Sequence, residues 1–329
     1  MGMIAVVGAA SYEGRQMLLS LEDRGLAHRG FDDPRDGGGQ VPDDITPVDL
    51  TRSEELTAAF RDAGVTDVIH LPRRGTVANS LRDPLEAFET VLVPLMRVLR
   101  ASVETGVQTF VLSSTASVYG KPKTIPVPEG AALKPISPLG AAARAAERMV
   151  RDVCEGHGIR TAILRYFNAA GADPRGRAGA SDAPKHLITA AVRIALGRRE
   201  GPLKIYGNDY GTPDGTPIRD YVHVADVASA HIDAVEYLRA GGDAVTLNCG
   251  YGEGASVQDV IRSVERVTGR PLDVVVEGRR AGDPPQLIAD TAAIRSVIGW
   301  RPIYNDLDLI VRTAMDWEAS QGAEIFENA

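Results

Sequence analysis

The chain has 329 residues, of which 44% are hydrophobic and 24% are charged, a composition typical of folded globular proteins rather than disordered ones. Its net charge of -8 argues against broad binding to nucleic acid or to a membrane surface, because both depend on clustered Lys and Arg. The cysteines, Cys154 and Cys249, lie far apart without metal-ligand spacing, so we expect buried thiols and no metal site. No leader or long apolar run follows Met1, which predicts a cytoplasmic protein.

Short apolar runs alternate with helical stretches along the first half of the chain. Strands are predicted at 4–7, 66–71, 109–114 and 161–167, and helices at Glu13–Arg24, Pro84–Thr105 and Pro138–Glu155. This alternation predicts an α/β fold, a doubly wound parallel sheet of the Rossmann type with helices on both faces. The segment 26–31 fits less well, since His28, Arg29 and Gly30 stand where a buried strand would be apolar. There, before a turn-forming stretch at 34–44, we expect a short, weakly held edge strand.

The pattern changes after Asn168, where Gly and Pro runs interrupt shorter elements. We therefore predict a dinucleotide-binding-type domain at 1–168 and a smaller C-terminal substrate-binding region at 169–329. The two are expected to interleave through strands and helices near 219–250. In open parallel sheets, loops of this kind build the ligand crevice outside the carboxyl ends of the strands.

A glycine-containing turn follows the first strand and precedes the first helix. It contains Gly8, Ser11, Tyr12 and Gly14, and such a turn lets backbone N–H groups meet a pyrophosphate at the helix N-terminus. Ser11 replaces the middle glycine of the usual pattern, and Glu13 adds a negative charge at the same place. The pattern fits a nucleotide site and equally a helix N-terminus that only packs.

Acidic residues stand at the spacing expected for the adenosine part of a dinucleotide. Asp32 or Asp33 lies roughly 20 residues past the turn, where a carboxylate would hold a ribose. Asp49 and Leu50 are candidates to flank an adenine. These residues predict a nucleotide site at the carboxyl end of the first strands.

The second half of the chain contains six long or irregular motifs: RYFNAAGADP (165–174), HLI (186–188), YGNDYGTPDGTPIRDYVHVADVASAH (206–231), LNCG (247–250), RRAGDPP (279–285) and GWRP (299–302). In these motifs the chain resembles the UDP-galactose 4-epimerase family of extended short-chain dehydrogenases/reductases. The resemblance implies a bound UDP-sugar, with NAD as the cofactor of the family. It also covers most of the first half, less evenly.

The resemblance assigns substrate contacts to particular residues. It implies that Asn168 and Arg219 contact the phosphates, that Arg280 contacts the pyrophosphate and that Asp283 holds the uridine ribose. We expect both arginines to face phosphate rather than to be solvated or paired with Asp220 and Asp283. Other substrate-binding positions implied by the same motifs are His186, Leu187 and Tyr206.

The catalytic positions of the family carry different residues in this chain. The resemblance implies a Tyr-x-x-x-Lys pair on the helix that begins near Pro138, but Leu139 and Ala143 stand there. In the family this tyrosine takes a proton from the sugar hydroxyl and the lysine lowers its pKa; leucine and alanine can do neither. Arg144 points about 100° away along the helix, so it does not replace them. The family's Ser/Thr position is retained as Thr115.

Further departures cluster around the same chemical step. At the end of the predicted strand 66–71, the family's pattern is replaced by His70-Leu71-Pro72-Arg73-Arg74, and the family lysine by Gly75. An expected asparagine pair reads Thr90-Val91. Pro72 removes a backbone donor. We therefore expect NAD binding to be weakened or lost.

The leading hypothesis is a UDP-hexose-binding protein deficient in redox epimerisation, a pseudoenzyme or a partner subunit. It would form a homodimer, or a heterodimer with a related subunit, through the helices at 84–105 and 138–155, although the alanines of the second helix could equally pack inside the monomer. The alternative is an active NAD-dependent UDP-glucose/UDP-galactose 4-epimerase, or a related sugar-nucleotide-modifying enzyme, whose base is Thr115, Tyr119 or His186. A regulator that reads UDP-sugar levels is a third hypothesis that the sequence does not separate from the first.

Overall fold

A seven-stranded parallel sheet forms the centre of the protein, as the alternating pattern predicts. The computed structural model describes residues 2–35, 42–73, 75–180, 186–280 and 282–321. The strand order is β11-β6-β5-β4-β1-β2-β3. The strands are β1 (Met3–Val7), β2 (His28–Asp32), β3 (Ile45–Pro47), β4 (Val65–His70), β5 (Thr109–Thr115), β6 (Arg160–Tyr166) and β11 (Val245–Cys249). The order reverses at β1, which makes the carboxyl ends of β1 and β4 the switch point of the sheet.

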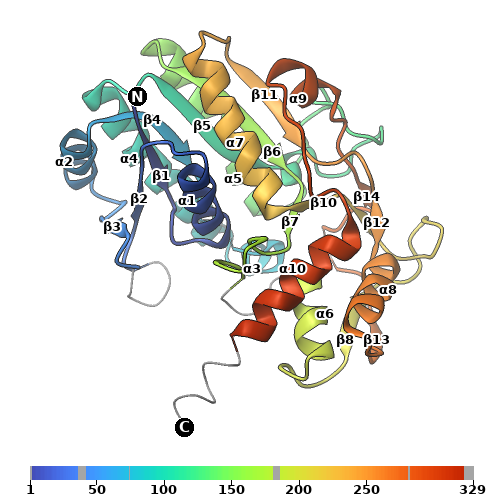
Figure 1. Ribbon diagram of the computed structural model, residues 1–329. Helices are drawn as coiled ribbons and strands as arrows, with labels where there is room; N and C mark the ends of the chain where they lie inside the picture. Colours follow the sequence, from blue (N-terminus) through green and yellow to red (C-terminus); the bar gives the residue numbers. More distant parts are fainter. Residues whose placement is uncertain (1, 36–41, 74, 181–185, 281, 322–329) are drawn as a thin grey trace.

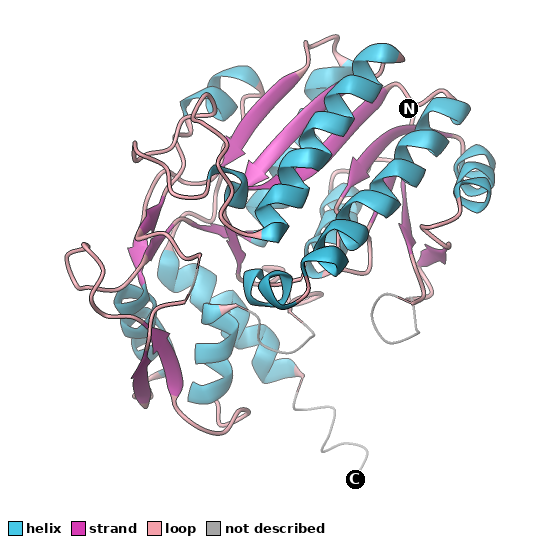
Figure 2. Ribbon diagram, turned by 180° about the vertical axis from the view of Figure 1, so that it is seen from behind, coloured by secondary structure: helices cyan, strands magenta, loops and turns pink. Residues whose placement is uncertain are grey.

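Helices cover both faces of this sheet. The helices α1 (Tyr12–Asp23) and α7 (Val224–Arg239) lie over one face (Figure 1). The other face carries α2 (Ser53–Ala63), α4 (Pro84–Thr105) and α5 (Pro138–Gly156), seen from behind in Figure 2. The short helices α3 (Val77–Arg82) and η1 (Ala116–Tyr119) follow β4 and β5. Each face buries its own apolar cluster against the sheet, so the doubly wound architecture is confirmed.

The helices begin where sequence signals place them. Ser137 caps α5 by accepting a hydrogen bond from the Gly140 amide at 3.2 Å, and Pro138 follows at the first helical position. Asp83 caps α4 in the same way, accepting from the Glu86 amide at 3.0 Å. Gly140 lies so close to η1 that a Cβ would stand 2.6 Å from the Ser117 carbonyl oxygen. Tight packing against η1 therefore sets the position of the first turn of α5.

The prediction of a weak edge strand at 26–31 was wrong. The strand β2 is five residues long and pairs with both β1 and β3, so the three-residue β3 forms the edge. Gly30 suits this interior place because a Cβ there would stand 2.9 Å from the Ala9 side chain and 3.1 Å from that of Ile45. Glycine therefore stands at position 30 because neighbouring side chains approach the backbone closely, and not because the strand needs an apolar residue there. Part of the turn predicted at 34–44 lies outside the described residues.

The smaller C-terminal region contains α6 (Leu187–Ala195), α8 (Val257–Thr268), α9 (Ala292–Val297) and α10 (Leu307–Ser320). Its strands pair in short sheets: β7 (Asn168–Ala170) with β10 (Tyr221–His223), β8 (Leu203–Tyr206) with β13 (Val274–Glu277), and β9 (Ile218–Arg219) with β12 (Ala255–Ser256) and β14 (Gln286–Leu287). The chain returns to the large sheet for α7 and β11. In Figure 1 the helices α6, α8 and α10 lie beyond the carboxyl ends of the strands of the large sheet.

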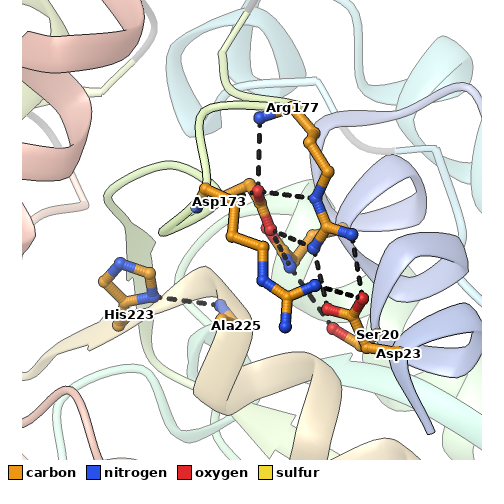
Figure 3. A network of polar contacts seen from close by, with 8 residues as sticks. Ser20, Asp23, Asp173, Arg177, His223 and Ala225 are labelled. Carbon is orange, nitrogen blue, oxygen red and sulfur yellow. Dashed lines mark hydrogen bonds and ion pairs between the residues drawn. The ribbon is translucent and has the colours of Figure 1, made fainter.

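A charged network ties the loop after β7 to the carboxyl end of α1 (Figure 3). Arg177 donates to both carboxylate oxygens of Asp23, at 2.9 and 2.8 Å, and to Asp173 at 2.9 Å. Arg175 reaches Asp23 at 2.8 Å, and the Gln16 amide reaches Asp173 at 3.3 Å. Because Asp173 is buried, these bonds satisfy a carboxylate that would otherwise be costly, and they hold the two regions together.

Both cysteines are buried free thiols, as predicted, and burial raises the pKa of Cys154 to about 12. In the part of the chain that the structure describes, no helix has both the length and the apolar character needed to cross a membrane. The alanines of α5 at 142, 143 and 146 are buried within the single chain. Packing inside the monomer therefore accounts for these three residues.

A buried ion pair joins α5 to β6. Arg165 donates to the Glu147 carboxylate through Nε at 2.8 Å and Nη2 at 2.6 Å, and Ser114 of β5 adds a hydroxyl donor at 2.6 Å. Burial raises the pKa of Glu147, but the hydrogen bonds and charge of Arg165 outweigh it and leave that pKa below its usual value. Glu147 lies one turn beyond Ala143 and two beyond Leu139, so the pair holds this face of α5 against the sheet.

We expect Glu147→Gln to lower the free energy of unfolding by about 3 kcal/mol, because it leaves a buried guanidinium without its carboxylate. Urea denaturation monitored by circular dichroism measures the change. Glu155→Gln on the exposed side of the same helix serves as the control and should stay within about 0.5 kcal/mol of wild type. A loss below 1 kcal/mol for Glu147→Gln would contradict a structural role for the pair.

Candidate functional site

The turn between β1 and α1 is held by its own polar groups. Gly8 has a φ of +88°, and a Cβ there would stand 2.2 Å from the Leu71 carbonyl oxygen, so only glycine fits. Ser11, which replaces the middle glycine, is the cap of α1: its hydroxyl donates to Gly8 O at 2.7 Å and accepts from the Gly14 amide at 3.0 Å. Tyr12 donates to Gly171 O at 2.6 Å and anchors the helix start to the loop after β7.

The predicted adenosine-side acids lie beside this turn. Asp32 at the end of β2 accepts from the Ala10 amide at 2.6 Å, so its carboxylate is at the turn itself. Asp33 accepts from the Leu50 amide at 3.1 Å. The guanidinium of Arg35 forms ion pairs with both Asp33 and Asp49, and its hydrogen bond holds the pKa of Asp33 below the usual value. The structure thus brings Asp32, Asp33, Asp49 and Leu50 together and adds a cation, Arg35, that motif reading missed.

A cavity of about 440 Å³ lies between the loop after β6 and the C-terminal region. It is lined by all seven residues predicted to bind the substrate: Asn168, His186, Leu187, Tyr206, Arg219, Arg280 and Asp283. Further polar residues to which the resemblance assigned no contact also line it, among them Arg199, Lys204 and Tyr221. Only the folded chain reveals these three, because they come from the loop after α6, from β8 and from β10, whose side chains converge in space.

The two arginines that the resemblance assigns to the phosphates, Arg219 and Arg280, already have partners. Arg219 forms an ion pair with Asp283 and donates to Pro284 O at 2.7 Å. The guanidinium of Arg280 stacks on the Tyr206 ring at 3.6 Å from its centroid. The expectation that Arg219 does not pair with Asp283 was therefore wrong, because the loop at 282–287 runs beside β9 and brings the two charges together. Asp220 turns away and accepts from the amides of Tyr251, Gly252 and Ala289.

Leu139 and Ala143 are embedded in apolar packing. Leu139 is 7% exposed and belongs to the cluster that also contains Val91 and Leu95 of α4. Ala143 is 4% exposed and belongs to the cluster on the other side, with Val118 and Tyr119. Neither residue lines the 440 Å³ cavity. At these two positions the side chains carry no group that can take or hold a proton.

Two of the three proposed replacement bases, Thr115 and Tyr119, form hydrogen bonds within the protein. Thr115 ends β5 and bonds Ser117, accepting from its amide at 3.2 Å. The Tyr119 hydroxyl donates to Asn248 at 2.6 Å and accepts from Arg165 at 2.9 Å. Burial raises the pKa of Tyr119. His186 is the member of the three that lines the cavity, where it precedes α6 and faces the Tyr12 ring at 6.4 Å.

The other departures in the first half have packing roles. Leu71 is buried, and its amide donates to Val7 O at 2.8 Å, so the β1–β4 pairing continues past His70. Val91 is buried in the cluster of Leu139, whereas Thr90 donates to Glu86 O within α4. Arg74, another of these departures, lies outside the described residues. Val91 thus makes apolar contacts at the position where the resemblance implies the second asparagine of the pair.

The residues at the turn fit the adenosine half of a dinucleotide. The first amides of α1 point out of the helix end, where they can donate to a pyrophosphate, and Asp32 is placed to accept from a ribose hydroxyl. At the opposite end, Leu139 and Ala143 offer no polar group to a nicotinamide ribose. The site therefore fits the two halves of NAD unequally.

Comparisons with known proteins identify a family and relatives that match most of the chain. Residues 4–250 match the family model described as "NAD dependent epimerase/dehydratase family". A UDP-glucose 4-epimerase of Azospirillum brasilense is 43% identical over 321 residues, covering 96% of this chain and 92% of that protein.

Solved structures match over the same length. The UDP-glucose 4-epimerase of Brucella ovis in complex with NAD has a TM-score of 0.90 and 37% identity, with 96% of this chain and 98% of that chain covered. The enzyme of the same name from Thermotoga maritima with UDP-glucose has a TM-score of 0.82 and 25% identity, covering 97% and 99%.

We expect Tyr119→Phe to lower the free energy of unfolding by about 1–3 kcal/mol, because it removes the donor to the buried Asn248 oxygen. Chemical denaturation gives the difference. Tyr237→Phe, a hydroxyl deletion on the partly exposed part of α7, is the matched control and should cost less than 0.5 kcal/mol. Equal stabilities of the two variants would show that the buried network does not depend on the Tyr119 hydroxyl.

Proposed function

The chain belongs to the NAD dependent epimerase/dehydratase family, and from that premise we propose that its cavity binds a UDP-hexose. The observation that carries the proposal is the convergence of seven motif residues on one cavity that holds three arginines, Arg199, Arg219 and Arg280. Guanidinium groups suit phosphate oxygens, and a carboxylate suits ribose hydroxyls. A relative in this family is solved with UDP-glucose, which supports the same ligand class here.

Binding requires the cations of the cavity to change partners. Arg219 would exchange the Asp283 carboxylate for a phosphate oxygen, which frees Asp283 to accept from the uridine ribose. Arg280 would leave the face of Tyr206 for the pyrophosphate and uncover an aromatic ring. Arg219 would exchange one charge-assisted contact for another, whereas Arg280 would exchange a cation–π contact for an ion pair.

For the cofactor, we propose NAD at the turn of β1 and α1. The Asp32 carboxylate and the first amides of α1 are the groups that would hold it, and a solved relative contains NAD. When bound, NAD supplies the hydride acceptor of this family's chemistry. Asp49 and Leu50 would flank the adenine, with Arg35 fixing Asp49 in place.

The first candidate for the chemistry is a protein deficient in the epimerisation step, a pseudoenzyme or partner subunit. It rests on Leu139 and Ala143, which cannot hold a proton, and on the binding of the Tyr119 hydroxyl to Arg165 and Asn248. A positioned acid or base is worth about 10²–10⁴ in rate, so the absence of both family groups would leave little turnover.

The second candidate is an active UDP-glucose 4-epimerase with a different base. The comparisons favour it over the first candidate, because the relatives that match along the whole chain are named for this activity and none indicates a loss. Of the three proposed bases, His186 lines the cavity, which makes it the one best placed to reach a hexose.

The proposal also assigns each ligand to one part of the chain. We propose that 1–168 serves the dinucleotide and 169–329 the UDP-hexose, with 219–250 shared, because α7 and β11 return to the large sheet. A dimer would form through α4 and α5. The buried reduced thiols of Cys154 and Cys249 support a cytoplasmic location.

UDP-glucose should stabilise the purified protein by about 2.7 kcal/mol at ~100 times its dissociation constant. Arg280→Ala should weaken UDP binding about tenfold or more, since it removes a charge-assisted contact. Chemical denaturation with and without UDP-glucose measures the stabilisation, and isothermal titration calorimetry measures the change in UDP affinity. The control Arg148→Ala removes an arginine of α5 that pairs with Asp152, and it should bind like wild type. Absence of any UDP or UDP-glucose binding would overturn the proposed function.

Turnover of UDP-galactose, followed by coupled oxidation of the UDP-glucose formed, separates the two candidates. A deficient protein gives no turnover above background, and Leu139→Tyr with Ala143→Lys should raise it while UDP affinity is kept. If the protein is an active enzyme, the wild type turns over UDP-galactose, and His186→Ala should lower its kcat about 10²-fold or more. Wild-type turnover would refute the first candidate, whatever the effect of the double substitution.

A further inference from the structure

A hydrogen bond joins two residues on opposite sides of the cofactor crevice. The Tyr166 hydroxyl donates to the Glu13 carboxylate at 3.1 Å, although the residues are 153 positions apart. Glu13 lies in the first turn of α1, after β1, and Tyr166 is the last residue of β6. The strands β4 and β5 stand between β1 and β6 in the sheet. The two side chains therefore meet beside the carboxyl ends of the intervening strands.

This contact lies on the course that an extended dinucleotide takes. In open parallel sheets the ligand occupies the crevice outside the carboxyl ends, with its pyrophosphate at the start of α1. Tyr166 is the register partner of Thr115, so it marks the end of the crevice where the hexose and nicotinamide would meet. The Glu13–Tyr166 bond thus connects the pyrophosphate end to the nicotinamide end.

The negative charge of Glu13 also opposes the binding of a dinucleotide at this turn. A carboxylate in the first turn of a helix satisfies the positive N-terminus of that helix, the role that a bound pyrophosphate would otherwise play. Arg15 does not compensate, since it donates to both oxygens of Asp44 at 2.8 Å. A dinucleotide would therefore bring two negative phosphates to a place that already holds one negative charge.

We infer that Glu13 determines the affinity of this site for dinucleotides: its carboxylate occupies the anion position of α1 and, with Tyr166, closes the crevice until NAD displaces it. The inference rests on the proposed NAD site at this turn. It predicts an effect limited to ligands that carry the diphosphate, because adenosine would occupy only the subsite of Asp32 and Asp49. Removal of the charge should matter more than removal of the hydrogen bond.

The test is calorimetric titration of NAD and, separately, of adenosine into wild type, Glu13→Gln, Tyr166→Phe and the control Glu22→Gln. Glu22 is an exposed acid on the same helix, farther from the turn. Glu13→Gln should raise NAD affinity about tenfold or more and leave adenosine affinity unchanged. Tyr166→Phe should raise NAD affinity by less, and Glu22→Gln should match wild type.

Other outcomes overturn the inference in distinguishable ways. Equal NAD affinity of wild type and Glu13→Gln would refute the role of Glu13 and leave the NAD site standing. A parallel rise in adenosine affinity would refute the diphosphate-specific effect. If no variant binds NAD while UDP-glucose still binds, both this inference and the proposed cofactor fail, and the UDP-hexose site is unaffected.

Discussion

The buried pair of Glu147 and Arg165 is the interaction on which the organisation of the site depends. It joins α5 to β6 inside the apolar layer, where neither charge could stay without the other. Arg165 also donates to Tyr119, and Tyr119 donates to Asn248 of β11. One network thus fixes the helix of the family's catalytic pair, the loop after β5 and the returning strand relative to one another.

This scaffold serves two halves with different chemistry. On the substrate side, loop residues converge on a polar cavity whose cations are balanced by Asp283 and by the Tyr206 ring. On the redox side, Leu139 and Val91 contribute to one apolar cluster between α4, α5 and the sheet. The polar half can exchange its internal partners for a charged ligand, whereas the apolar half has no group to exchange. This contrast is the reason to test ligand binding and turnover separately.

The start of α1 shows the same use of internal partners. Ser11, Asp32 and Glu13 satisfy the turn and the helix end with side chains of the chain itself. A ligand must therefore compete with groups already in place, and its affinity reflects the difference between the two sets of contacts. In the cavity the competing Asp283 carboxylate is paired with the Arg219 cation, whereas at α1 the Glu13 carboxylate accepts a hydrogen bond from the neutral Tyr166 hydroxyl.

The sequence by itself determined the doubly wound fold, because alternating strand and helix periods are local properties of the chain. It also determined which loop residues share the cavity, since the motifs around Asn168, Arg219 and Arg280 are long and irregular. Only the tertiary structure decided that β2 is an interior strand, that Arg35 holds Asp49, that Tyr119 is bound to Arg165 and that Glu13 meets Tyr166. These contacts join residues from separate elements, and their partners depend on strand order and on how closely the layers approach. Local periodicity carries no information about either.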